Sequence, residues 1–307
     1  MSAEPIRYFH RAKQTVETEQ VYGEAWLRWT YGSAPGRLAL HALFKRAFVS
    51  RYYGWRMTRS FSANQVLPFI VDYDLDVDEF AKKPFAFKSF NDFFYRALKP
   101  GARPIATDHS TGSGQGDHVA VLPADGRHLA FQNVDGAEGF YAKGQSFDLK
   151  SFLGDESLAQ EFAGGSLLIS RLCPVDYHRF HFPVGGKAAE PRLINGFLYS
   201  VSPIALRQNL AYLWENKRMV TLVESPQFGR VAVCEIGATL VGSIVQTFLP
   251  DRAVAKGEEK GLFKFGGSCV VTIFRPGKIK FDADLVQQTT AGLEVYARMG
   301  EALGVAS

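Results

Sequence analysis

The expected secondary structure changes near residue 106, and this change most constrains the fold. The first hundred residues read as mostly helical, with helix-start signatures at 62–65 and 89–92 that place a hydroxyl at the cap and Gln or Asp three residues later. We expect the second of these helices to run to about Leu98 and to stop at Pro100-Gly101. The polar, glycine-rich stretch that follows at 107–117 is interpreted as a linker.

Beyond this stretch, short β-rich runs are separated by Gly, Pro and Asp turns. The runs are 119–122, 166–170, 219–224, 230–236, 239–248 and 270–274. One helical interruption is expected at 204–214, and neither a fixed-period repeat nor a regular alternation of strands and helices is found. The sequence therefore predicts an α+β protein, with a helical region at 1–105 and a mostly β domain at 106–307.

Composition excludes several classes of protein. The 307 residues are 46% apolar and 21% charged, which is typical of a globular chain rather than a disordered or fibrous one. The three cysteines are an odd number without C-x-x-C spacing, so neither a disulfide framework nor a zinc site is indicated. No signal peptide is visible, and the longest uncharged stretch, 236–250, is shorter than the ~20 apolar residues of a spanning helix. We expect a protein that is soluble or lies on a membrane surface, in a reducing compartment.

The positive charge of the chain is concentrated in the helical region. Residues 25–71 contain no Asp or Glu, and their cations alternate with aromatic residues. The cations are Arg28, Arg37, Lys45, Arg46, Arg51, Arg56 and Arg59. This mixture suits an anionic lipid surface, because rings can lie at the headgroup level while cations meet phosphate. A solvated helix face beside a core and a nucleic-acid surface are the competing interpretations.

Near the C-terminus, Gly266-Gly267-Ser268-Cys269 leads into the apolar run at 270–274. A Gly-Gly-Ser segment is most often simply a turn. A serine hydroxyl becomes a nucleophile, however, when a neighbouring base takes its proton, and a preceding glycine leaves its carbonyl open to attack. Self-cleavage of the backbone before Ser268 is therefore one hypothesis.

Candidates for the base and for a group that orients it occur elsewhere in the chain. His178 and His181 lie in one short segment, and Asp125-Gly126 follows the first β-rich run. Taken singly, the histidines are most often loop residues held by hydrogen bonds, and Asp-Gly is most often a hairpin turn. A metal site is not expected, because no acidic or Cys partner stands at the spacing of a zinc protease.

Taken together, the motifs resemble those of one family, the phosphatidylserine decarboxylases, in the order in which that family carries them. They are FNDFFYRALKPGARPI at 90–105, PADG at 123–126, KGQSF at 143–147, RLCPVDYHRFHFP at 171–183, GATLVGSI at 237–244, and KGE at 256–258 leading to GGS at 266–268. YFHR at 8–11 and WTY at 29–31 resemble the longer bacterial branch of the family.

This resemblance implies autocatalytic cleavage between Gly267 and Ser268, with Asp125, His181 and Ser268 as the processing triad. His181 would take the proton of Ser268, whose hydroxyl would attack the Gly267 carbonyl. The products would be a large chain, 1–267, and a small chain, 268–307, with Ser268 converted into a covalent pyruvoyl group. His178 would then handle the proton and position the carboxylate during decarboxylation.

The implied activity is that of a carboxy-lyase in phospholipid biosynthesis, which converts phosphatidylserine to phosphatidylethanolamine and CO2 through a Schiff base with the pyruvoyl group. The β domain is expected to resemble a barrel-sandwich hybrid. The resemblance also implies peripheral attachment to the cytoplasmic side of the cell membrane, an anionic membrane surface as partner, and no nucleic-acid partner. A homodimer is left open.

Two positions depart from the family pattern. Cys269 stands where the family usually has Thr, which raises the question of slow maturation, and Arg127-His128 replace a more apolar run. Two alternative functions also stay open. One is a pyruvoyl-dependent decarboxylase of a free amino acid or of another serine-headed lipid, and the other is a non-cleaving scaffold or lipid-binding module with the same fold.

Overall fold

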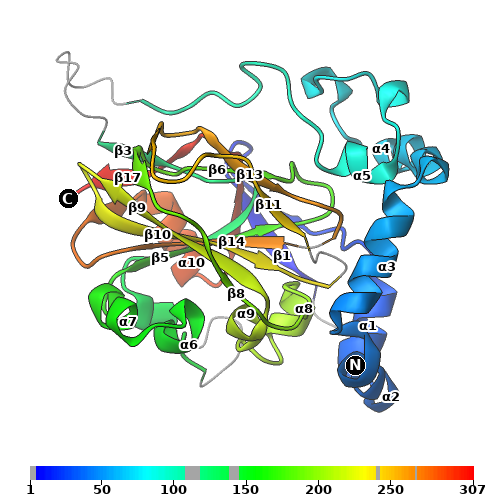
Figure 1. The fold of residues 1–307 in the computed structure, drawn as a ribbon, viewed down its shortest axis with the longest axis horizontal. Coiled ribbons are helices and arrows are strands. Elements are labelled where there is room, and N and C mark those ends of the chain that lie inside the picture. The colour runs from blue at the N-terminus through cyan, green and yellow to red at the C-terminus, as the bar shows by residue number, and fades with distance from the viewer. Residues whose placement is uncertain (1–4, 108–117, 138–144, 240–242, 267) are drawn as a thin grey trace.

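The computed structural model describes residues 5–107, 118–137, 145–239, 243–266 and 268–307. An eleven-stranded mixed sheet forms the centre of the described molecule (Figure 1). Its strands, in spatial order, are β12 (Ala253–Val254), β7 (Gly186–Ala188), β9 (Arg218–Ser225), β10 (Gly229–Gly237), β14 (Ser268–Phe274), β5 (Ser166–Leu172), β4 (Gly126–Phe131), β16 (Glu294–Ala297), β1 (Arg7–His10) and β2 (Thr15–Thr18), with β8 (Arg192–Ile194) paired to β9. The path is open, with β12 and β2 at its ends.

The middle of this sheet consists of strands that are buried on both faces. Every residue of β14 and of its antiparallel neighbour β5 is buried. Along β14 the side chains alternate between two hydrophobic clusters, with Cys269 and Val271 in one and Val270 and Phe274 in the other. Ser268 begins this strand, so its position is set by the most deeply buried part of the sheet.

Two smaller sheets complete the β structure. The first has the order β11 (Ile244–Gln246), β13 (Glu259–Phe263) and β6 (Arg179–His181), and the second has the order β15 (Ile279–Phe281), β17 (Ala302–Ala306) and β3 (Val119–Val121). β6 carries one of the two candidate histidines and immediately follows the other. The first small sheet therefore holds the candidate bases, whereas the large sheet holds the candidate nucleophile.

Helices of the N-terminal region stand along one side of the large sheet (Figure 1). They are α1 (Glu24–Gly32), α2 (Ala34–Ala39), the π-helical turn η1 (Leu40–Phe44), α3 (Ala47–Thr58), α4 (Val66–Asp72) and α5 (Phe90–Phe94), with 3-10 turns η2 (Ser60–Gln65), η3 (Val77–Glu79) and η4 (Pro84–Ala86). Phe69, Phe90, Phe93 and Phe94 of α4 and α5 form an aromatic cluster with Phe265. Through this cluster, the N-terminal region packs against the residue that precedes the Gly-Gly-Ser motif.

The remaining helices are short and lie against the β structure. They are η5 (Val134–Ala137), α6 (Leu149–Leu153), α7 (Glu156–Phe162), α8 (Pro203–Leu206), α9 (Tyr212–Glu215) and α10 (Ala283–Thr290). α10 packs on β4 and β16 of the large sheet, and α8 packs on α1. Among the described residues, no helix is both long enough and apolar enough to cross a bilayer.

The predicted α+β class is confirmed, with helices and strands in comparable amounts and an open mixed sheet at the centre. Ser89 caps α5 as expected, since its hydroxyl accepts a hydrogen bond from the Asp92 N–H at 3.1 Å. The prediction that this helix reaches Leu98 was wrong, because α5 ends at Phe94. The backbone at 97–99 is instead hydrogen-bonded to residues 79–81, through Ala81 N–H to Ala97 O and Lys99 N–H to Glu79 O.

Two other features differ in detail from the sequence-based expectation. Residues 7–18 form the β1–β2 hairpin, and β1 pairs in parallel with β16 near the other end of the chain. Within the strand expected at 239–248, the structure forms β11 at Ile244–Gln246, and 240–242 lie outside the described residues. Residues 108–117 of the expected linker also lie outside them. The expected helical interruption at 204–214 consists of the two short helices α8 and α9.

Candidate functional site

Ser268 lies at the start of β14, between Leu172 of β5 and Gly237 of β10. The residue is fully buried, and its Oγ has no hydrogen-bond partner among the described residues. A buried hydroxyl without a hydrogen-bond partner costs free energy of folding. Such a group therefore indicates either a functional role or a partner outside the described residues. Gly267, the other residue of the expected cleavage site, lies outside the described residues.

Gly266, two residues before Ser268, has a φ of +131°, a backbone conformation that residues other than glycine rarely adopt. This backbone bend lies between Phe265, which is anchored in the aromatic cluster, and the start of β14. The chain therefore turns sharply just before the candidate nucleophile.

His178 packs against this turn. Its ring packs against Phe94 with 3.8 Å between ring centroids and 38° between the ring planes, and its Nδ1 lies 3.0 Å from the carbonyl oxygen of Asp176. Because a carbonyl can only accept, Nδ1 carries the proton and Nε2 keeps its lone pair. Burial lowers the pKa of His178 to about 3, a shift that the backbone of Asp176 and of Gly266 opposes and the Arg96 charge assists. His178 is thus a neutral imidazole beside the candidate cleavage site.

The loop that carries His178 is fixed by Asp176. Its Oδ2 accepts a hydrogen bond of 2.6 Å from Arg127 Nη1 and another of 2.6 Å from the Cys173 N–H. The buried guanidinium of Arg96 donates to the Val175 carbonyl at 3.2 Å from the other side of the loop. Arg127, one of the two departures from the family pattern, thus has a structural role in holding Asp176. Its neighbour His128 contacts the Ser170 hydroxyl at 2.9 Å through Nδ1 and the Ala297 carbonyl oxygen at 3.3 Å through Nε2.

His181 ends β6 and is oriented in the same way as His178. Its Nδ1 lies 3.0 Å from the Gly257 carbonyl, so Nε2 again has the free lone pair. Its backbone N–H donates to the Pro123 carbonyl at 2.7 Å, which brings it next to the segment that carries Asp125. Burial lowers the pKa of His181, although the Gly257 carbonyl and the charges of Glu259 and Asp125 act in the opposite direction.

Asp125 is buried in the connection between β3 and β4, and both of its carboxylate oxygens are engaged. Arg103 donates from Nε to Oδ1 at 2.9 Å and from Nη2 to Oδ2 at 2.6 Å. The Met299 N–H donates to Oδ1 at 2.8 Å. The next residue, Gly126, lies so close to β5 that a Cβ there would meet the Arg171 carbonyl oxygen at 2.5 Å. Glycine at 126 is therefore required for the strand pairing that positions Asp125.

Three buried polar atoms of the expected site share one property. His178 Nε2, His181 Nε2 and Ser268 Oγ are all without a hydrogen-bond partner among the described residues. Two basic nitrogens and one hydroxyl, all shielded from water, can take up and deliver protons at a reacting serine. These residues also fit a pyruvoyl group formed at position 268, because the hydroxyl that would be consumed is not part of any described hydrogen bond.

Cys269, the departure from the family pattern, faces away from this site. Its side chain packs in the cluster that contains Val271, on the opposite side of β14 from Ser268. Burial raises the pKa of the Cys269 thiol to about 12. The thiol is therefore protonated and inert, and it does not compete with Ser268 as a nucleophile. No cluster of three or more His, Cys, Asp or Glu suited to a metal occurs in the part of the chain that the structure describes.

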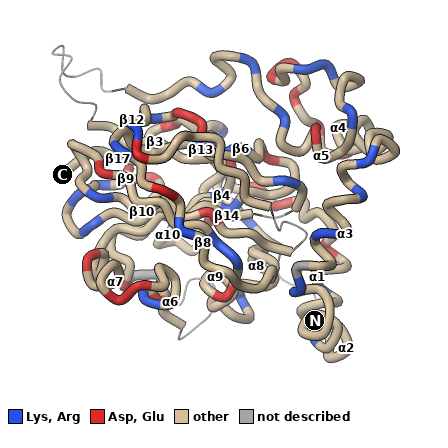
Figure 2. The backbone as a smooth tube through the Cα atoms, in the orientation of Figure 1, with Lys and Arg blue, Asp and Glu red and all other residues tan. Residues whose placement is uncertain are grey.

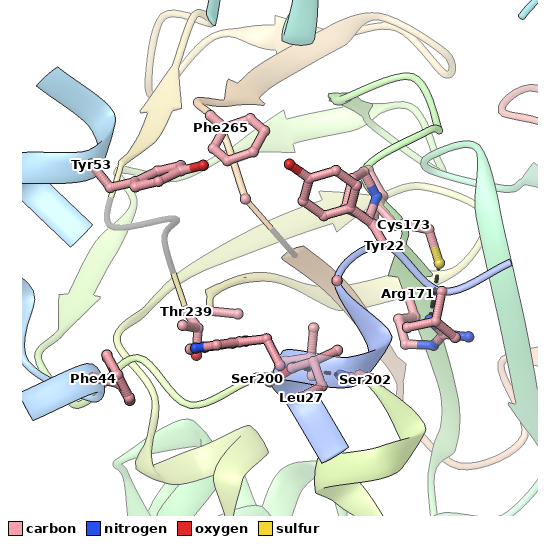
Figure 3. Close-up of a pocket in the computed structure, with 18 of the residues that line it drawn as sticks. Tyr22, Leu27, Phe44, Tyr53, Arg171, Cys173, Ser200, Ser202, Thr239 and Phe265 are labelled. Carbon is pink, nitrogen blue, oxygen red and sulfur yellow. Dashed lines mark hydrogen bonds between the residues drawn. The ribbon is translucent and has the colours of Figure 1, made fainter. Parts of the chain in front are cut away.

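An apolar cavity of about 420 Å³ leads to the site from the N-terminal helices. In Figure 3, Tyr22, Tyr53 and Phe265 lie on one side of this cavity, and Leu27 and Phe44 lie on the other. Gly266 also lines the cavity, so the space ends at the backbone next to the candidate cleavage site. A cavity of this size and character can accept part of a hydrocarbon chain.

The fold and the site together define a protein with a buried serine at the start of a core strand and two neutral histidines that present basic nitrogens. Comparison with known proteins then identifies the family. The family profile described as phosphatidylserine decarboxylase matches residues 90–305, and the chain belongs to this decarboxylase family.

Curated proteins of this family align with the chain over nearly its whole length. The chain is 46% identical over 309 residues to a protein of Chlamydia muridarum, covering 99% of this chain and 98% of that one. It is 41% identical over 304 residues to a protein of Fusobacterium nucleatum, covering 99% of both. A protein of Desulfitobacterium hafniense is 42% identical over 300 residues, covering 98% of each. All three are named phosphatidylserine decarboxylase proenzyme.

Several residues that build the site were not found by sequence reasoning. Arg103 holds Asp125, Arg96 and Arg127 hold the loop before His178, and Phe94 packs against the His178 ring. Arg96, Arg103 and Phe94 fall inside the FNDFFYRALKPGARPI motif, which the sequence analysis used only as a sign of resemblance. A search for cations inside such motifs that could neutralise the buried acids would have found both arginines.

Proposed function

We propose that this chain is the precursor of a pyruvoyl-dependent decarboxylase that converts phosphatidylserine to phosphatidylethanolamine and CO2. The observation that carries the proposal is the buried Ser268 hydroxyl, which has no described partner and lies in a chain with two buried imidazoles that each present a basic Nε2. The relatives named phosphatidylserine decarboxylase proenzyme support both the substrate and the existence of a cleaved precursor.

In the proposed maturation, His181 Nε2 takes the proton from Ser268 Oγ, and the oxygen attacks the Gly267 carbonyl carbon. The peptide bond breaks, so that the carbonyl forms an ester with Oγ and the proton goes to the Ser268 nitrogen. Removal of the Ser268 α-proton then expels residues 1–267 as a carboxylate and leaves a dehydroalanine. Addition of water and loss of ammonia convert this residue to the pyruvoyl group at the head of the small chain, 268–307.

In this scheme Asp125 stabilises the imidazolium that forms on His181. Its charge already acts to raise the pKa of His181, in opposition to the effect of burial. The low resting pKa keeps His181 neutral and ready to accept a proton, while Asp125 limits the cost of holding that proton. Both carboxylate oxygens of Asp125 accept hydrogen bonds from Arg103 in the structure. We therefore assign Asp125 an electrostatic part in the proposed triad.

Decarboxylation needs an acceptor for the electrons left on the α-carbon, and a pyruvoyl group supplies that acceptor when it is present. The part assigned to His178 is to return a proton to the α-carbon and to position the carboxylate before it leaves. The ring is held for this task by Phe94 on one face and by the Asp176 carbonyl at Nδ1. The surrounding burial excludes water, which limits stray protonation.

A lipid substrate and a membrane surface are supported by the N-terminal helices. The apolar cavity beside Gly266 opens among these helices, and their outer surface exposes large apolar side chains. These include Trp29, Leu38, Phe48, Tyr52 and Trp55. Figure 2 shows basic residues along α3, which contains Arg51 and Arg56 and no Asp or Glu. We propose that this surface lies on the anionic, cytoplasmic face of the membrane, with the apolar side chains in the interface and the cations at the phosphates.

The intact mass of the purified protein tests this function directly. We expect two chains that separate before residue 268, the smaller with a blocked N-terminus that reacts with carbonyl reagents. Ser268→Ala and His181→Ala variants should remain full length, because they lack the nucleophile and its base. A wild-type chain that never matures, or matured protein that releases no CO2 from phosphatidylserine, would contradict the proposal.

A further inference from the structure

A second groove, of about 380 Å³, lies on the other side of α3 from the apolar cavity. Val49 and Tyr53 of α3 line the cavity, whereas Ser50, Arg51 and Gly54 line the groove. Phe265 lines both spaces. The two spaces therefore flank one helix and meet at the residue next to Gly266.

The charge of the groove differs from that of the cavity. Three cations line it, Arg51, Lys217 and Lys264, and no Asp or Glu is among the lining residues. Arg51 and Lys264 form no ion pair with any residue that the structure describes, and both are exposed. The Asn91 amide and the Ser243 hydroxyl add further polar groups to the lining. A groove with this lining favours an anion.

The backbone ties the groove to the candidate cleavage site at two points. Lys264 is four residues before Ser268 in the chain. The Lys217 carbonyl accepts a hydrogen bond of 2.9 Å from the Gly237 N–H, and Gly237 is the residue paired with Ser268 between β10 and β14. Asn91, on the wall of the groove, accepts a hydrogen bond from the Phe265 N–H through its Oδ1 at 3.0 Å. An anion in the groove would thus lie close to position 268.

We propose that this groove binds the phosphodiester of the lipid substrate, with Arg51, Lys217 and Lys264 as its cationic ligands, while an acyl chain occupies the apolar cavity. This inference rests on the proposed function. In a phosphatidylserine the phosphate is separated from the reacting amine by only a few bonds, and the acyl chains extend from the other end of the glycerol. A cationic subsite for the phosphate and an apolar cavity for an acyl chain, meeting beside Gly266, match that order of groups. Arginine and lysine are the usual ligands of phosphate oxygens.

The test uses matured enzyme and a short-chain substrate, dihexanoyl phosphatidylserine, kept monomeric so that docking on a surface does not contribute. The variant is Arg51→Gln with Lys264→Gln. The matched control, Arg207→Gln with Lys278→Gln, removes the same charges from exposed positions that line neither the groove nor the cavity. Loss of a charge-assisted hydrogen bond predicts a KM increase of about tenfold or more in the variant, with kcat changed by less than about threefold. The control should keep the wild-type KM.

An amine without a phosphate separates this role from a general effect on the site. L-serine methyl ester, trapped on the small chain by cyanoborohydride, should label the groove variant as fast as the wild type. Dihexanoyl phosphatidylglycerol, which has the phosphodiester but no amine, should inhibit the wild type and the control at lower concentration than the variant. Equal KM values in the variant and the control, or a parallel loss of ester trapping, would overturn the proposal. Inhibition by inorganic phosphate that the variant loses, with phosphatidylglycerol inhibition unchanged, would show a free-phosphate site and would also overturn it.

Failure of the proposed function would be recognised separately, as a wild-type chain that does not mature or does not release CO2. In that case calorimetry of dihexanoyl phosphatidylglycerol with the uncleaved protein tests the groove by itself. We expect weaker binding to the variant than to the control, and equal binding would overturn the subsite. The Arg51→Gln single variant serves if the double variant fails to fold, because Arg51 lies on the exposed side of α3.

Discussion

Arg103 holds the buried carboxylate of Asp125 with two of its nitrogens, at 2.6 Å from Nη2 and 2.9 Å from Nε. Both side chains are almost fully buried. The same guanidinium also reaches Glu79 at 2.9 Å, and Glu79 in turn pairs with Arg298. The acid that the family resemblance places in the processing triad is therefore part of a buried ionic network that begins in the N-terminal region.

We predict that Arg103→Met slows maturation by about tenfold or more and destabilises the protein by about 3–5 kcal/mol, because Asp125 would be left buried without its cation. A time course of intact mass measures the first effect, and urea unfolding measures the second. Arg298→Gln is the control, since Arg298 pairs with the same Glu79 from a half-exposed position. Normal maturation of Arg103→Met would show that the ion pair does not support processing.

His178→Ala should mature but decarboxylate poorly. The proposed role of His178 is proton transfer to the substrate, and loss of a general acid typically lowers kcat by about 10²–10⁴-fold. CO2 release, normalised to the amount of matured small chain, measures this. If the variant instead stayed full length, His178 would have to be reassigned to the cleavage step, which its contact with Gly266 would then explain.

Cys269 is not expected to limit maturation. Because side chains alternate across a strand, the side chain at 269 faces the opposite cluster from Ser268, so Cys269→Val and Cys269→Thr should mature within about twofold of the wild-type rate. Cys269→Thr should lose about 1–3 kcal/mol of stability, since its hydroxyl would be buried in an apolar cluster. Much faster maturation in Cys269→Thr alone would show that a hydroxyl at 269 assists cleavage after all.

The stability of the protein should fall as the pH drops from 7 to 5. The pKa of His178 is lowered to about 3 and that of His128 to about 4, in both cases mainly by burial. The unfolded chain binds these protons near pH 6.5, while the folded chain excludes them, so each histidine removes about 2 kcal/mol between pH 7 and pH 5.

His128→Gln isolates one of these contributions, because glutamine can keep a hydrogen bond to Ser170 but does not titrate. The loss of unfolding free energy between pH 7 and pH 5 should be about 2 kcal/mol smaller in this variant than in the wild type. Urea unfolding at the two pH values measures the difference. An identical loss in both proteins would mean that His128 is not buried in its neutral form.

Binding to vesicles should depend on exposed apolar residues of the N-terminal helices. Leu38 is 72% exposed and Phe48 is 59% exposed, so Leu38→Asp and Phe48→Asp should each weaken binding to phosphatidylserine vesicles by about tenfold or more. Maturation should not change. Leu249→Asp, at a position 60% exposed outside the N-terminal helices, is the control. Equal binding by all three variants and the wild type in a flotation assay would rule out this docking surface.

Local sequence determined the features that depend on neighbouring residues. The Ser89 cap needs only the Asp92 N–H three residues on, and the predicted strand at 270–274, which in the structure begins two residues earlier at Ser268, follows from a continuous run of β-branched and aromatic residues. The motif around Ser268 and the two histidines marked the candidate site through the resemblance of all the motifs together to one family, since each motif taken singly has an ordinary structural interpretation.

The tertiary structure decided which partners those residues have. Helix α5 ends at Phe94, and the backbone of residues 97–99 is hydrogen-bonded to residues 79–81 instead of continuing the helix. The carboxylate of Asp125 accepts hydrogen bonds from Arg103 and not from His181. The cationic groove joins α3 to Lys264, more than two hundred residues later in the chain. Such contacts depend on the path of the whole chain and on burial, which sets the charge state of each side chain. No local pattern contains that information, so it became visible only in the folded molecule.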